Sequence, residues 1–430
     1  MTTAPFPPDK PIFSFYGDDF TGSTDALEAL ATSDVSAVLY LRPPDAEDLS
    51  KFPGVRAVGI AGESRSRSPQ WMRENLPVIF ERLREIGAPV VQYKVCSTFD
   101  SSPNTGSIGC AIEIGKQVFA NRAVGVVPAA PQLDRWVVFG NLFAAGGDGI
   151  HRIDRHPAMR QHPITPMGEG DLLLHLACQT ALRIAGVPLL ELRRNEPAWP
   201  LDADVILFDG LEPADMAQAA RRIWEHRSGQ QTFAVGSSGL TYGLLDYWRS
   251  QGWLPDRRLP RDAALPNQGR VLVLAGSCSP ATQDQICSAL RAGFHGIQLN
   301  PANWSAAATQ AEAVSQLGAG RSVVLYLAQG AADRMDIQDQ PVIAAAMGQL
   351  LRNVILESGV SRVVVAGGDT STHAVRELGI SALTFAAPLT RGAPLCRAHG
   401  WPGELQLVLK GGQIGSEHFF EEALFYPEAP

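Results

Sequence analysis

Short apolar runs that end in glycine or aspartate recur along this sequence, and most of them lead into an amphipathic stretch. A strand that is buried on both faces of a parallel sheet is a continuous apolar run, and the helix after it is apolar on one side only. The runs expected to form strands are Ile12–Tyr16, Val90–Val95, Val124–Val127, Val205–Phe208, Thr232–Val235, Val271–Ala275, Val323–Leu327, Val363–Ala366, Ala382–Ala386 and Leu405–Leu409. This alternation predicts an α/β fold of Rossmann-like α/β/α domains with mostly parallel sheets.

The predicted strands fall into two groups along the chain. At 430 residues the chain exceeds the usual size of a single hydrophobic core, because domains average about 150 residues. Between the groups, Leu254–Gln268 is rich in proline and arginine and has no hydrophobic periodicity, which is typical of an extended linker. We therefore predict two domains, residues 1–254 and 269–430, joined by a linker at residues 255–268.

Composition and charge narrow the classes of function. The hydrophobic content of 45% and the charged content of 19% are typical of a globular protein, and the net charge of −8 argues against a nucleic-acid partner. The first ten residues lack the basic start and apolar stretch of a signal peptide, and no run is apolar and long enough to span a bilayer, so we expect a cytoplasmic protein without a membrane partner. The six cysteines contain no CxxC pair, which argues against a disulfide framework or a zinc site.

Two consecutive carboxylates, Asp18 and Asp19, follow the first predicted strand, before a helix expected to begin near Ser23. In open parallel sheets, ligands bind beyond the carboxyl ends of the strands, where this pair would lie. Paired carboxylates can divide the work of a general base and of orienting a substrate hydroxyl. An alternative is that one aspartate only caps the helix that follows.

A second strand ends at Lys94, followed by a polar loop and a helix expected from about Ile108. The loop carries more hydroxyl and carboxylate groups than a connection requires, namely Ser97, Thr98, Asp100, Ser101, Ser102 and Thr105. Lys94 could hold a carboxylate or a phosphate as a point charge, and it would share a rim with Asp18 and Asp19. The alternative is a solvated loop with a surface lysine.

The segment from His151 to Gly170 is crowded with basic side chains. They are His151, Arg152, Arg155, His156, Arg160 and His162. Their spacing matches no HExxH or Cys/His pattern, so guanidinium groups that bind a carboxylate are favoured over a metal site.

Three glycine-rich turns follow predicted strands of the second half: Gly276–Ser279, Gly367–Ser371 and Lys410–Gly415. Ser279 and Pro280 are typical of an N-cap and of a first helical residue. Glycine lets the backbone approach a ligand, and the exposed amides of a helix N-terminus attract phosphate. An ordinary strand-to-helix turn would explain any one of them, but three in one domain favour a nucleotide pocket.

Common nucleotide and hydrolase motifs are missing from the sequence. It contains no GxxxxGK[ST], no GxGxxG after a strand and no GxSxG. A phosphate site would therefore have a less common design. A dehydrogenase is disfavoured in addition by the lack of a suitably spaced acidic partner for the ribose.

Taken together, six segments of the sequence resemble the four-carbon acid sugar kinase family. They are Tyr16–Asp25 (YGDDFTGSTD), Lys94 with its STFDSSP loop, His162–Met167 (HPITPM), Ala275–Ser279 (AGSCS), Ala366–Ser371 (AGGDTS) and Lys410–Gly415 (KGGQIG). The resemblance covers nearly the whole chain, in order. It implies an N-terminal domain that binds a sugar acid, a C-terminal domain that binds ATP, and an active site in the cleft between them.

The same resemblance implies roles for individual residues, with ATP and Mg²⁺ as the cofactors. Asp18, Asp19 and Lys94 are expected to be catalytic. The residues expected to bind the sugar acid are Thr21, Ser97, Thr98, Asp100, Arg160 and His162. The residues expected to bind the nucleotide are Ser277, Ser279, Gly367, Gly368, Asp369, Thr370, Gly411 and Gly412.

The substrate half departs from the commoner family pattern at Gly17, in the STD run and in the loop after Lys94. The acid therefore stays open among 3-oxo-tetronate, 3-oxo-isoapionate, threonate and erythronate. A protein that binds the same ligands without catalysis is disfavoured by the intact Asp18, Asp19 and Lys94. The sequence leaves open a homo-oligomer, the Mg²⁺ ligands and which of Asp18 and Asp19 is the base.

Overall fold

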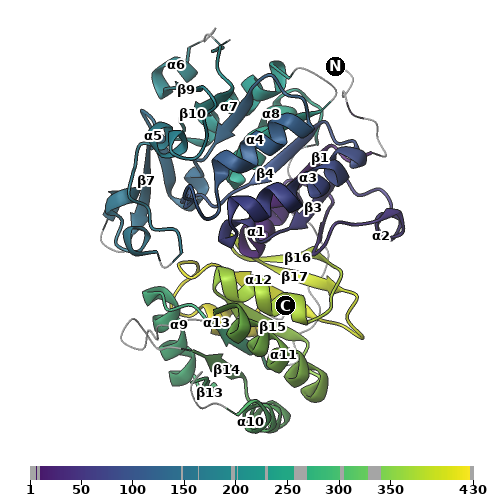
Figure 1. The fold of residues 1–430 in the computed structure, drawn as a ribbon. Helices are drawn as coiled ribbons and strands as arrows, with labels where there is room; N and C mark the ends of the chain where they lie inside the picture. The colour runs from purple at the N-terminus through teal and green to yellow at the C-terminus, as the bar shows by residue number, and fades with distance from the viewer. Residues whose placement is uncertain are drawn as a thin grey trace. The chain divides into compact units, whose positions relative to one another are not determined.

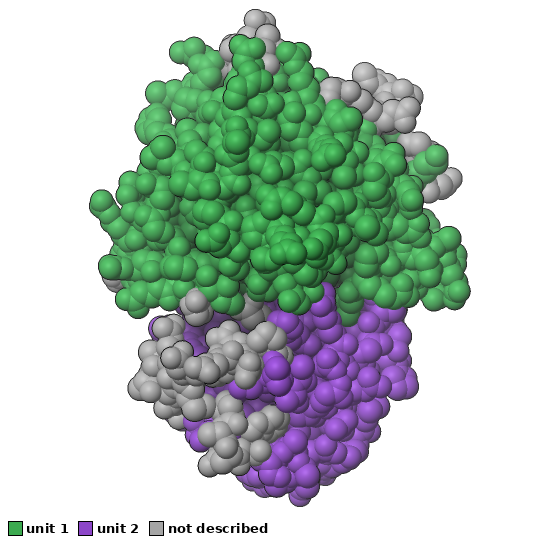
Figure 2. All heavy atoms as spheres, in the orientation of Figure 1, with its two compact units in different colours: residues 1–259 green, residues 260–430 purple. Residues whose placement is uncertain are grey.

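The computed structural model describes residues 6, 10–146, 149–162, 164–194, 199–200, 202–227, 231–255, 269–300, 305–327 and 340–426. The chain divides into two compact units, Met1–Leu259 and Pro260–Pro430, which Figure 2 shows in different colours. The linker predicted at residues 255–268 lies outside the described residues except for Pro255.

The first unit is built on a parallel sheet whose strands are joined by helices (Figure 1). Its sheet strands are β1 (Phe13–Gly17), β2 (Ala37–Tyr40), β3 (Ala57–Ala61), β4 (Val90–Lys94), β5 (Val124–Val127), β9 (Ile184–Val187), β10 (Val205–Phe208) and β11 (Thr232–Gly236). The helices are α1 (Phe20–Ala31), α2 (Ala46–Ser50), α3 (Pro69–Ile86), α4 (Ile108–Val118), α5 (Leu172–Ala177), α6 (Leu189–Leu192), α7 (Pro213–Glu225) and α8 (Ser238–Ser250). The strand order is β2-β3-β1-β4-β11-β5-β10-β9, and every neighbouring pair is parallel.

Helices cover this sheet in two layers. Helices α3 and α4 pack on each other, and α8 packs against both α1 and α7. A separate antiparallel sheet in the same unit contains β6 (Arg135–Val138), β7 (Asn141–Gly146) and β8 (Gly149–Arg152). The short 3₁₀ helices η3 (Ile153–Arg155) and η4 (Met159–Gln161) follow it, so the basic segment of the sequence belongs to this smaller sheet and its extension.

The second unit repeats the plan on a smaller scale. Its strands are β12 (Leu272–Ala275), β13 (His295–Gln298), β14 (Val323–Tyr326), β15 (Arg362–Ala366), β16 (Ala382–Thr390), β17 (Ala393–His399) and β18 (Gln406–Lys410). The helices are α9 (Pro280–Arg291), α10 (Ala306–Gly318), α11 (Gln340–Ser358), α12 (Gly368–Glu377) and α13 (Phe419–Phe425). The strand order within the unit is β13-β14-β12-β15-β18-β17-β16.

In both units the strand order reverses beside the first strand. The chain goes from β1 to β2 and β3 on one side and then to β4 on the other, and it goes from β12 to β13 and β14 and then to β15 in the same way. At such a reversal the two following loops diverge, which leaves room for a ligand beyond the carboxyl ends of the strands. The residues after β1 and β4, and those after β12 and β15, are therefore where the fold can place ligands.

The predicted α/β fold is confirmed, and each predicted strand is present with ends that shift by a few residues. The sequence did not predict strands β2, β3, β9, β13 and β17, or the antiparallel sheet of β6, β7 and β8. In the second unit β16, β17 and β18 pair in antiparallel fashion, so only part of that sheet is parallel. Helix α1 begins at Phe20 rather than near Ser23, because Asp19 caps it, and Gly368–Ser371 form the first turn of α12 rather than a loop before it.

Candidate functional site

The turn after β1 is held tightly against the end of β4. Gly17 is the partner of Lys94 in the parallel register, and the Asp18 amide donates a hydrogen bond of 2.9 Å to the Lys94 carbonyl. A Cβ at Gly17 would lie 1.9 Å from Ser23 Oγ, so only glycine allows the chain to turn this closely over α1. The turn thus brings the aspartate pair and Lys94 to one place.

Asp19 is engaged by its own helix. Its Oδ1 accepts from the Gly22 amide at 2.7 Å, and its Oδ2 accepts from Thr21 Oγ1 at 2.7 Å. Arg65 Nη2 lies 2.8 Å from the same Oδ2. The helix-cap alternative therefore describes Asp19 well, and Thr21 acts here as a partner of that cap.

Asp18 lies in a different environment from its neighbour. Its side chain is buried, with 3% of the residue exposed, and its Oδ1 has no hydrogen-bond partner among the described residues. Burial and the nearby charge of Asp19 raise the pKa of Asp18 to about 7, against the smaller opposing effects of Arg65 and Lys94. An unpartnered carboxylate with a pKa near neutrality is suited to accept a proton.

Lys94 is fully buried and paired. Its Nζ lies 3.1 Å from Asp25 Oδ2 and donates to the Val95 carbonyl at 3.2 Å. Burial alone would lower the pKa of Lys94, but the charge of Asp25, with smaller effects from Asp18 and Asp19, raises it. Lys94 therefore stays charged beside the aspartate pair, with Asp25 as its partner, which the sequence analysis did not identify.

The loop after Lys94 is joined to the segment near residue 165 by side-chain hydrogen bonds. Thr98 Oγ1 donates to Asp100 Oδ1, and Thr165 Oγ1 donates to Asp100 Oδ2 at 3.0 Å. His162 Nδ1 accepts from the Thr165 amide at 3.1 Å. Burial would raise the pKa of Asp100, but Arg65, His162 and the two threonines lower it, so the carboxylate is charged.

Arg65, like Asp25, belongs to this site and was not predicted from the sequence. It lies in the 3₁₀ helix η1 (Ser64–Ser66), directly after β3, and its amide donates to the Asp18 carbonyl at 3.1 Å. Its guanidinium pairs with Asp19. The charge of Arg65 opposes the rise in the pKa of Asp18 and contributes to the lowered pKa of Asp100. The signal was the strand Ala57–Ala61, because the carboxyl end of a strand next to β1 must lie beside Asp18.

The other predicted substrate residues are more exposed than the aspartates and Lys94 of this cluster. Ser97 is half-buried in the loop after Lys94, and Arg160 is exposed on η4. His156 is buried and accepts from the amides of Ala158 and Met159, which is a structural role. Of the basic segment, His162 is the residue that the structure connects to Asp100.

In the second unit the three glycine-rich turns converge. Ser279 caps α9, and its Oγ and that of Thr282 both donate to the Gly412 carbonyl, the latter at 3.0 Å. A Cβ at Gly412 would lie 2.4 Å from Ser277 Oγ, so the turn after β18 rests directly on the turn after β12. Ser277, Ser279, Gly411 and Gly412 are all half-buried, which leaves this surface accessible to a ligand.

The turn after β15 completes the group. Gly367 has a φ of +119°, and its Cα lies against the Ser277 backbone, because a Cβ there would be 3.2 Å from Ser277 N. A Cβ at Gly276 would lie 2.0 Å from Thr370 Oγ1. Gly368 opens α12 beside them, and the side chain of Asp369 lies outside the described residues.

Lys410 lies at the base of these turns and was not among the predicted site residues. It is fully buried, and its Nζ donates to Thr282 Oγ1 and to the Gly411 carbonyl, both at 3.1 Å. Burial lowers the pKa of Lys410 to about 7. In the sequence, Lys410 lies at the end of a predicted strand, as Lys94 does, and this shared position could have identified it.

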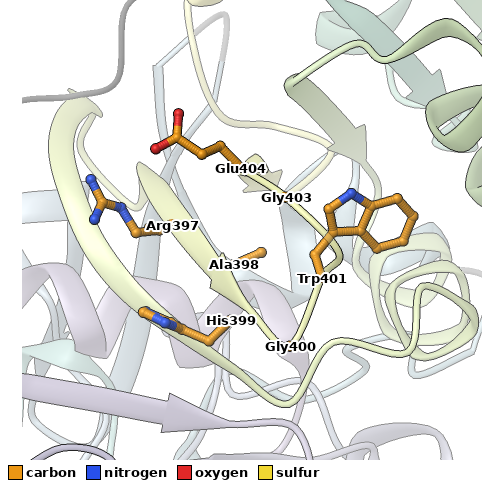
Figure 3. A pocket seen from close by; sticks show the side chains of 7 residues that line it. All are labelled: Arg397, Ala398, His399, Gly400, Trp401, Gly403 and Glu404. Atoms are coloured by element: carbon orange, nitrogen blue, oxygen red, sulfur yellow. The ribbon is translucent and has the colours of Figure 1, made fainter.

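A surface cavity of about 300 Å³ lies elsewhere on the second unit. Figure 3 shows that Arg397, His399, Trp401 and Glu404 line it, all from the hairpin that joins β17 to β18. That hairpin is at the amino end of β18, whereas Gly411 and Gly412 follow its carboxyl end. The cavity is therefore separate from the glycine-rich turns.

The described residues contain neither a metal-binding group of side chains nor a membrane-spanning helix. No group of three or more His, Cys, Asp or Glu side chains is arranged to hold a metal ion there. Among these residues, no helix has the length and apolar character that crossing a membrane requires.

Family models match most of the chain. Residues 13–244 match a family described as a sugar-binding N-terminal domain, and residues 272–420 match one described as a nucleotide-binding C-terminal domain. The two matched ranges contain the two groups of strand-end residues described above.

Relatives of known name are similar over nearly their whole length. A 3-oxo-isoapionate kinase of Paraburkholderia graminis is 44% identical, over 95% of this chain and 93% of the relative. A 3-oxo-tetronate kinase of Methylobacterium radiotolerans is 30% identical over 95% of this chain and 97% of the relative, and one of Pseudomonas savastanoi pv. phaseolicola is 29% identical over 96% and 97%.

Solved structures share the fold. A Salmonella typhimurium LT2 protein that carries a provisional tRNA synthase name superposes with a TM-score of 0.77 at 24% identity, over 96% of this chain and 98% of that one. A Haemophilus influenzae protein superposes with a TM-score of 0.68 at 22% identity, over 96% and 99%. At these identities the likeness concerns the fold alone.

Proposed function

The chain belongs to the four-carbon acid sugar kinase family, and from this membership we propose that it phosphorylates a hydroxyl group of 3-oxo-isoapionate with ATP. The reaction class, an ATP-dependent kinase acting on a small sugar acid, is common to the named relatives. The particular acid rests on one observation, the 44% identity with a 3-oxo-isoapionate kinase over nearly the full length of both chains. The second candidate is 3-oxo-tetronate, because relatives at about 30% identity carry that name.

Asp18 is the proposed general base. Its unpartnered Oδ1 and its pKa of about 7 support this role, since a base works best when its pKa is close to the working pH. Asp19 is engaged by the α1 cap and by Arg65, so it is proposed to hold the turn and the guanidinium in place. Asp18 would accept the proton that the acceptor hydroxyl loses as its oxygen attacks phosphorus.

Arg65 and His162 are the proposed partners of the substrate carboxylate. A guanidinium offers several donors, so Arg65 can keep Asp19 and still donate to a second anion. His162 lies on the other side of Asp100, linked through Thr165. Lys94 is committed to Asp25 and is proposed to balance the charge of the aspartate pair, while Arg160, Ser97 and Thr98 remain predicted substrate contacts.

The turns of the second unit are suited to hold the phosphates of ATP. A Cβ at Gly276 or Gly412 would collide with a side chain of a neighbouring turn, and one at Gly367 would lie 3.2 Å from Ser277 N, so the three backbones come close together. Half-buried hydroxyls of Ser277 and Ser279 and the first amides of α12 are the proposed phosphate contacts. Mg²⁺, which binds phosphate oxygens and neutralises their charge, is proposed to enter with ATP.

A substrate panel tests this function directly. Release of ADP would be measured with ATP, Mg²⁺ and 3-oxo-isoapionate, 3-oxo-tetronate, threonate or erythronate in turn. We expect the highest kcat/KM with 3-oxo-isoapionate. A higher kcat/KM with 3-oxo-tetronate would reassign the acid, and no ADP release with any acid, by a protein that still binds ATP in calorimetry, would leave a binding protein without catalysis.

A further inference from the structure

Helix α9 carries a row of polar side chains that contact the chain from Gly412 onwards. These are Ser279, Thr282, Gln285 and Ser288, each three positions after the one before, so that each is a neighbour of the next on the helix surface and the row winds around the helix. Three of them lie in α9 and Ser279 is its N-cap. We refer to these four residues as the α9 seam.

Successive residues of the α9 seam make hydrogen bonds to successive residues of the segment 412–421. Ser279 and Thr282 donate to the Gly412 carbonyl. Gln285 Nε2 donates to the carbonyls of Ile414 and Ser416, at 3.0 and 2.8 Å. Further along, Ser288 Oγ lies 2.9 Å from His418 Nδ1 and 2.6 Å from Glu421 Oε1.

The seam residues inside α9 are buried, whereas much of the segment that they hold is not. Thr282 and Gln285 are fully buried, and Gly412 and Ile414 are only half-buried. The segment 411–418 has no strand or helix of its own, so few backbone hydrogen bonds fix it. Its position is therefore set mainly from α9, and at its end by α13, which packs on α9 through Phe419 and Phe420.

We infer that Thr282 and Gln285 are positioning residues for ATP, because they fix the Gly411–Gly415 turn against the turns after β12 and β15. This inference rests on the proposed nucleotide site. Neither side chain needs to touch the nucleotide. Thr282 holds the Gly412 carbonyl and Gln285 holds those of Ile414 and Ser416, so that the Gly412 backbone stays close to Ser277, where a Cβ would lie 2.4 Å from Ser277 Oγ.

A set of four variants of the full-length protein separates positioning from general stability. Thr282→Val keeps the shape and removes the hydroxyl, and Thr282→Ser restores it. Gln285→Met keeps the length and removes both donors. Gln283→Met is the matched control, since Gln283 is a half-buried glutamine of the same helix outside the seam.

The expected result is a selective loss of nucleotide affinity. Because Gln285→Met removes two hydrogen bonds to the turn, it should raise the KM and the calorimetric Kd for MgATP about tenfold. Thr282→Val should act in the same direction. Thr282→Ser and Gln283→Met should stay within about twofold of the wild type, and the KM for the sugar acid should change little in all four variants.

Thermal melting and circular dichroism report whether each variant folds. If Thr282→Val and Gln285→Met lower the melting temperature but leave the Kd for MgATP unchanged, the α9 seam is structural only and the inference is overturned. It is also overturned if Thr282→Ser weakens MgATP binding as much as Thr282→Val. A wild-type protein that binds no MgATP would instead overturn the nucleotide site of the proposed function.

Discussion

The two units use the same local strand order but fill the reversal with different chemistry. After β1, β3 and β4 the first unit gathers charged side chains, namely Asp18, Asp19, Arg65 and Lys94, with Asp25 and Asp100 beside them. After β12, β15 and β18 the second unit gathers glycines, hydroxyls and carbonyl groups around the buried Lys410. The shared scaffold therefore provides the location, and the residues of the turns decide which ligand each unit suits.

Burial acts in opposite directions at the two sites. In the first unit it raises the pKa of a carboxyl group, Asp18, and in the second it lowers the pKa of an amine, Lys410, each to about 7. The pKa of Asp18 is raised by burial and by the charge of Asp19, with Arg65 and Lys94 partly offsetting them, whereas burial is the cause that acts on Lys410. The first unit therefore holds its buried carboxyl group among charged partners, and the second holds its buried amine beside a hydroxyl and a carbonyl group.

The largest effect is expected at Asp18. Asp18→Asn keeps the shape but cannot accept a proton, so turnover should fall about 10²- to 10⁴-fold while the Kd for MgATP stays unchanged. In the wild type, kcat/KM should rise with pH through about 7 as Asp18 loses its proton. A steady-state assay of both proteins from pH 5.5 to 8.5, a range set to bracket about 7, checks this.

Asp19→Asn is the companion of that experiment. Because Asp19 caps α1 and pairs with Arg65, its loss should lower the melting temperature and raise the KM for the acid more than it lowers kcat. If Asp19→Asn loses the larger part of turnover and Asp18→Asn does not, the assignment of the base is reversed.

The next effect is expected at Arg65. Arg65→Ala removes a guanidinium from a desolvated ionic contact, which typically costs about 2–5 kcal/mol, so the KM for the acid should rise about a hundredfold. The KM for ATP should change little. Arg67→Ala is the matched control, because Arg67 pairs with Glu63 in the same segment at 2.8 Å. Equal effects of the two variants on the KM for the acid would remove Arg65 from the substrate site.

A smaller effect is expected at Gly412, in the second unit. Gly412→Ala places a Cβ 2.4 Å from Ser277 Oγ, so the Ser277 hydroxyl, a proposed phosphate contact, must move and the Kd for MgATP should rise about tenfold. Gly318→Ala is the control, since a Cβ there meets no atom within 4 Å. Isothermal titration calorimetry measures both, and an unchanged Kd in Gly412→Ala would contradict the predicted nucleotide contact.

Sequence reasoning found the strand ends but not all the groups between them. Asp18, Asp19 and Lys94 were found because they follow apolar runs that are easy to recognise. Arg65 was missed because β3 is a short run of small residues, AVGIA, and Asp25 was missed because it lies inside a helix and meets Lys94 only after folding. The antiparallel β6–β8 sheet was missed because half-buried hairpins lack the continuous apolar signal of parallel strands.

The sequence likewise could not show that Lys410 is buried. KGGQIG identified a glycine-rich turn, but a lysine at a strand end reads the same whether solvent or Phe419 covers it. The seam of α9 shows the same limit, because a spacing of three in polar residues is also the pattern of an exposed helix face. Only the packing of α13 on α9 distinguishes the two cases.

The smallest expected effect is on the free energy of unfolding at high pH, which should depend on Lys410 and not on Asp18. Between pH 7 and its usual value near 10.5, Lys410 is deprotonated in the folded protein and protonated in the unfolded chain. The unfolded chain then binds the extra proton, so the free energy of unfolding should rise with pH across this window, and Lys410 should add nothing to its slope with pH below about 7.

Lys410→Met removes the titrating amine, so the folded and unfolded states no longer differ in the protons bound at this position. The variant should lose that part of the upward slope of melting temperature with pH, amounting to about a few degrees between pH 7 and 9.5. Asp18→Asn should leave that slope unchanged and alter only the range from 3.8 to about 7, where folded Asp18 holds a proton that the unfolded chain has lost and stability falls as pH rises. Calorimetric melting of the three proteins against pH measures both windows. If Lys410→Met and the wild type keep the same slope above pH 7, Lys410 is charged in the folded state, and the second unit, like the first, must hold a buried ion through partners that offset its burial.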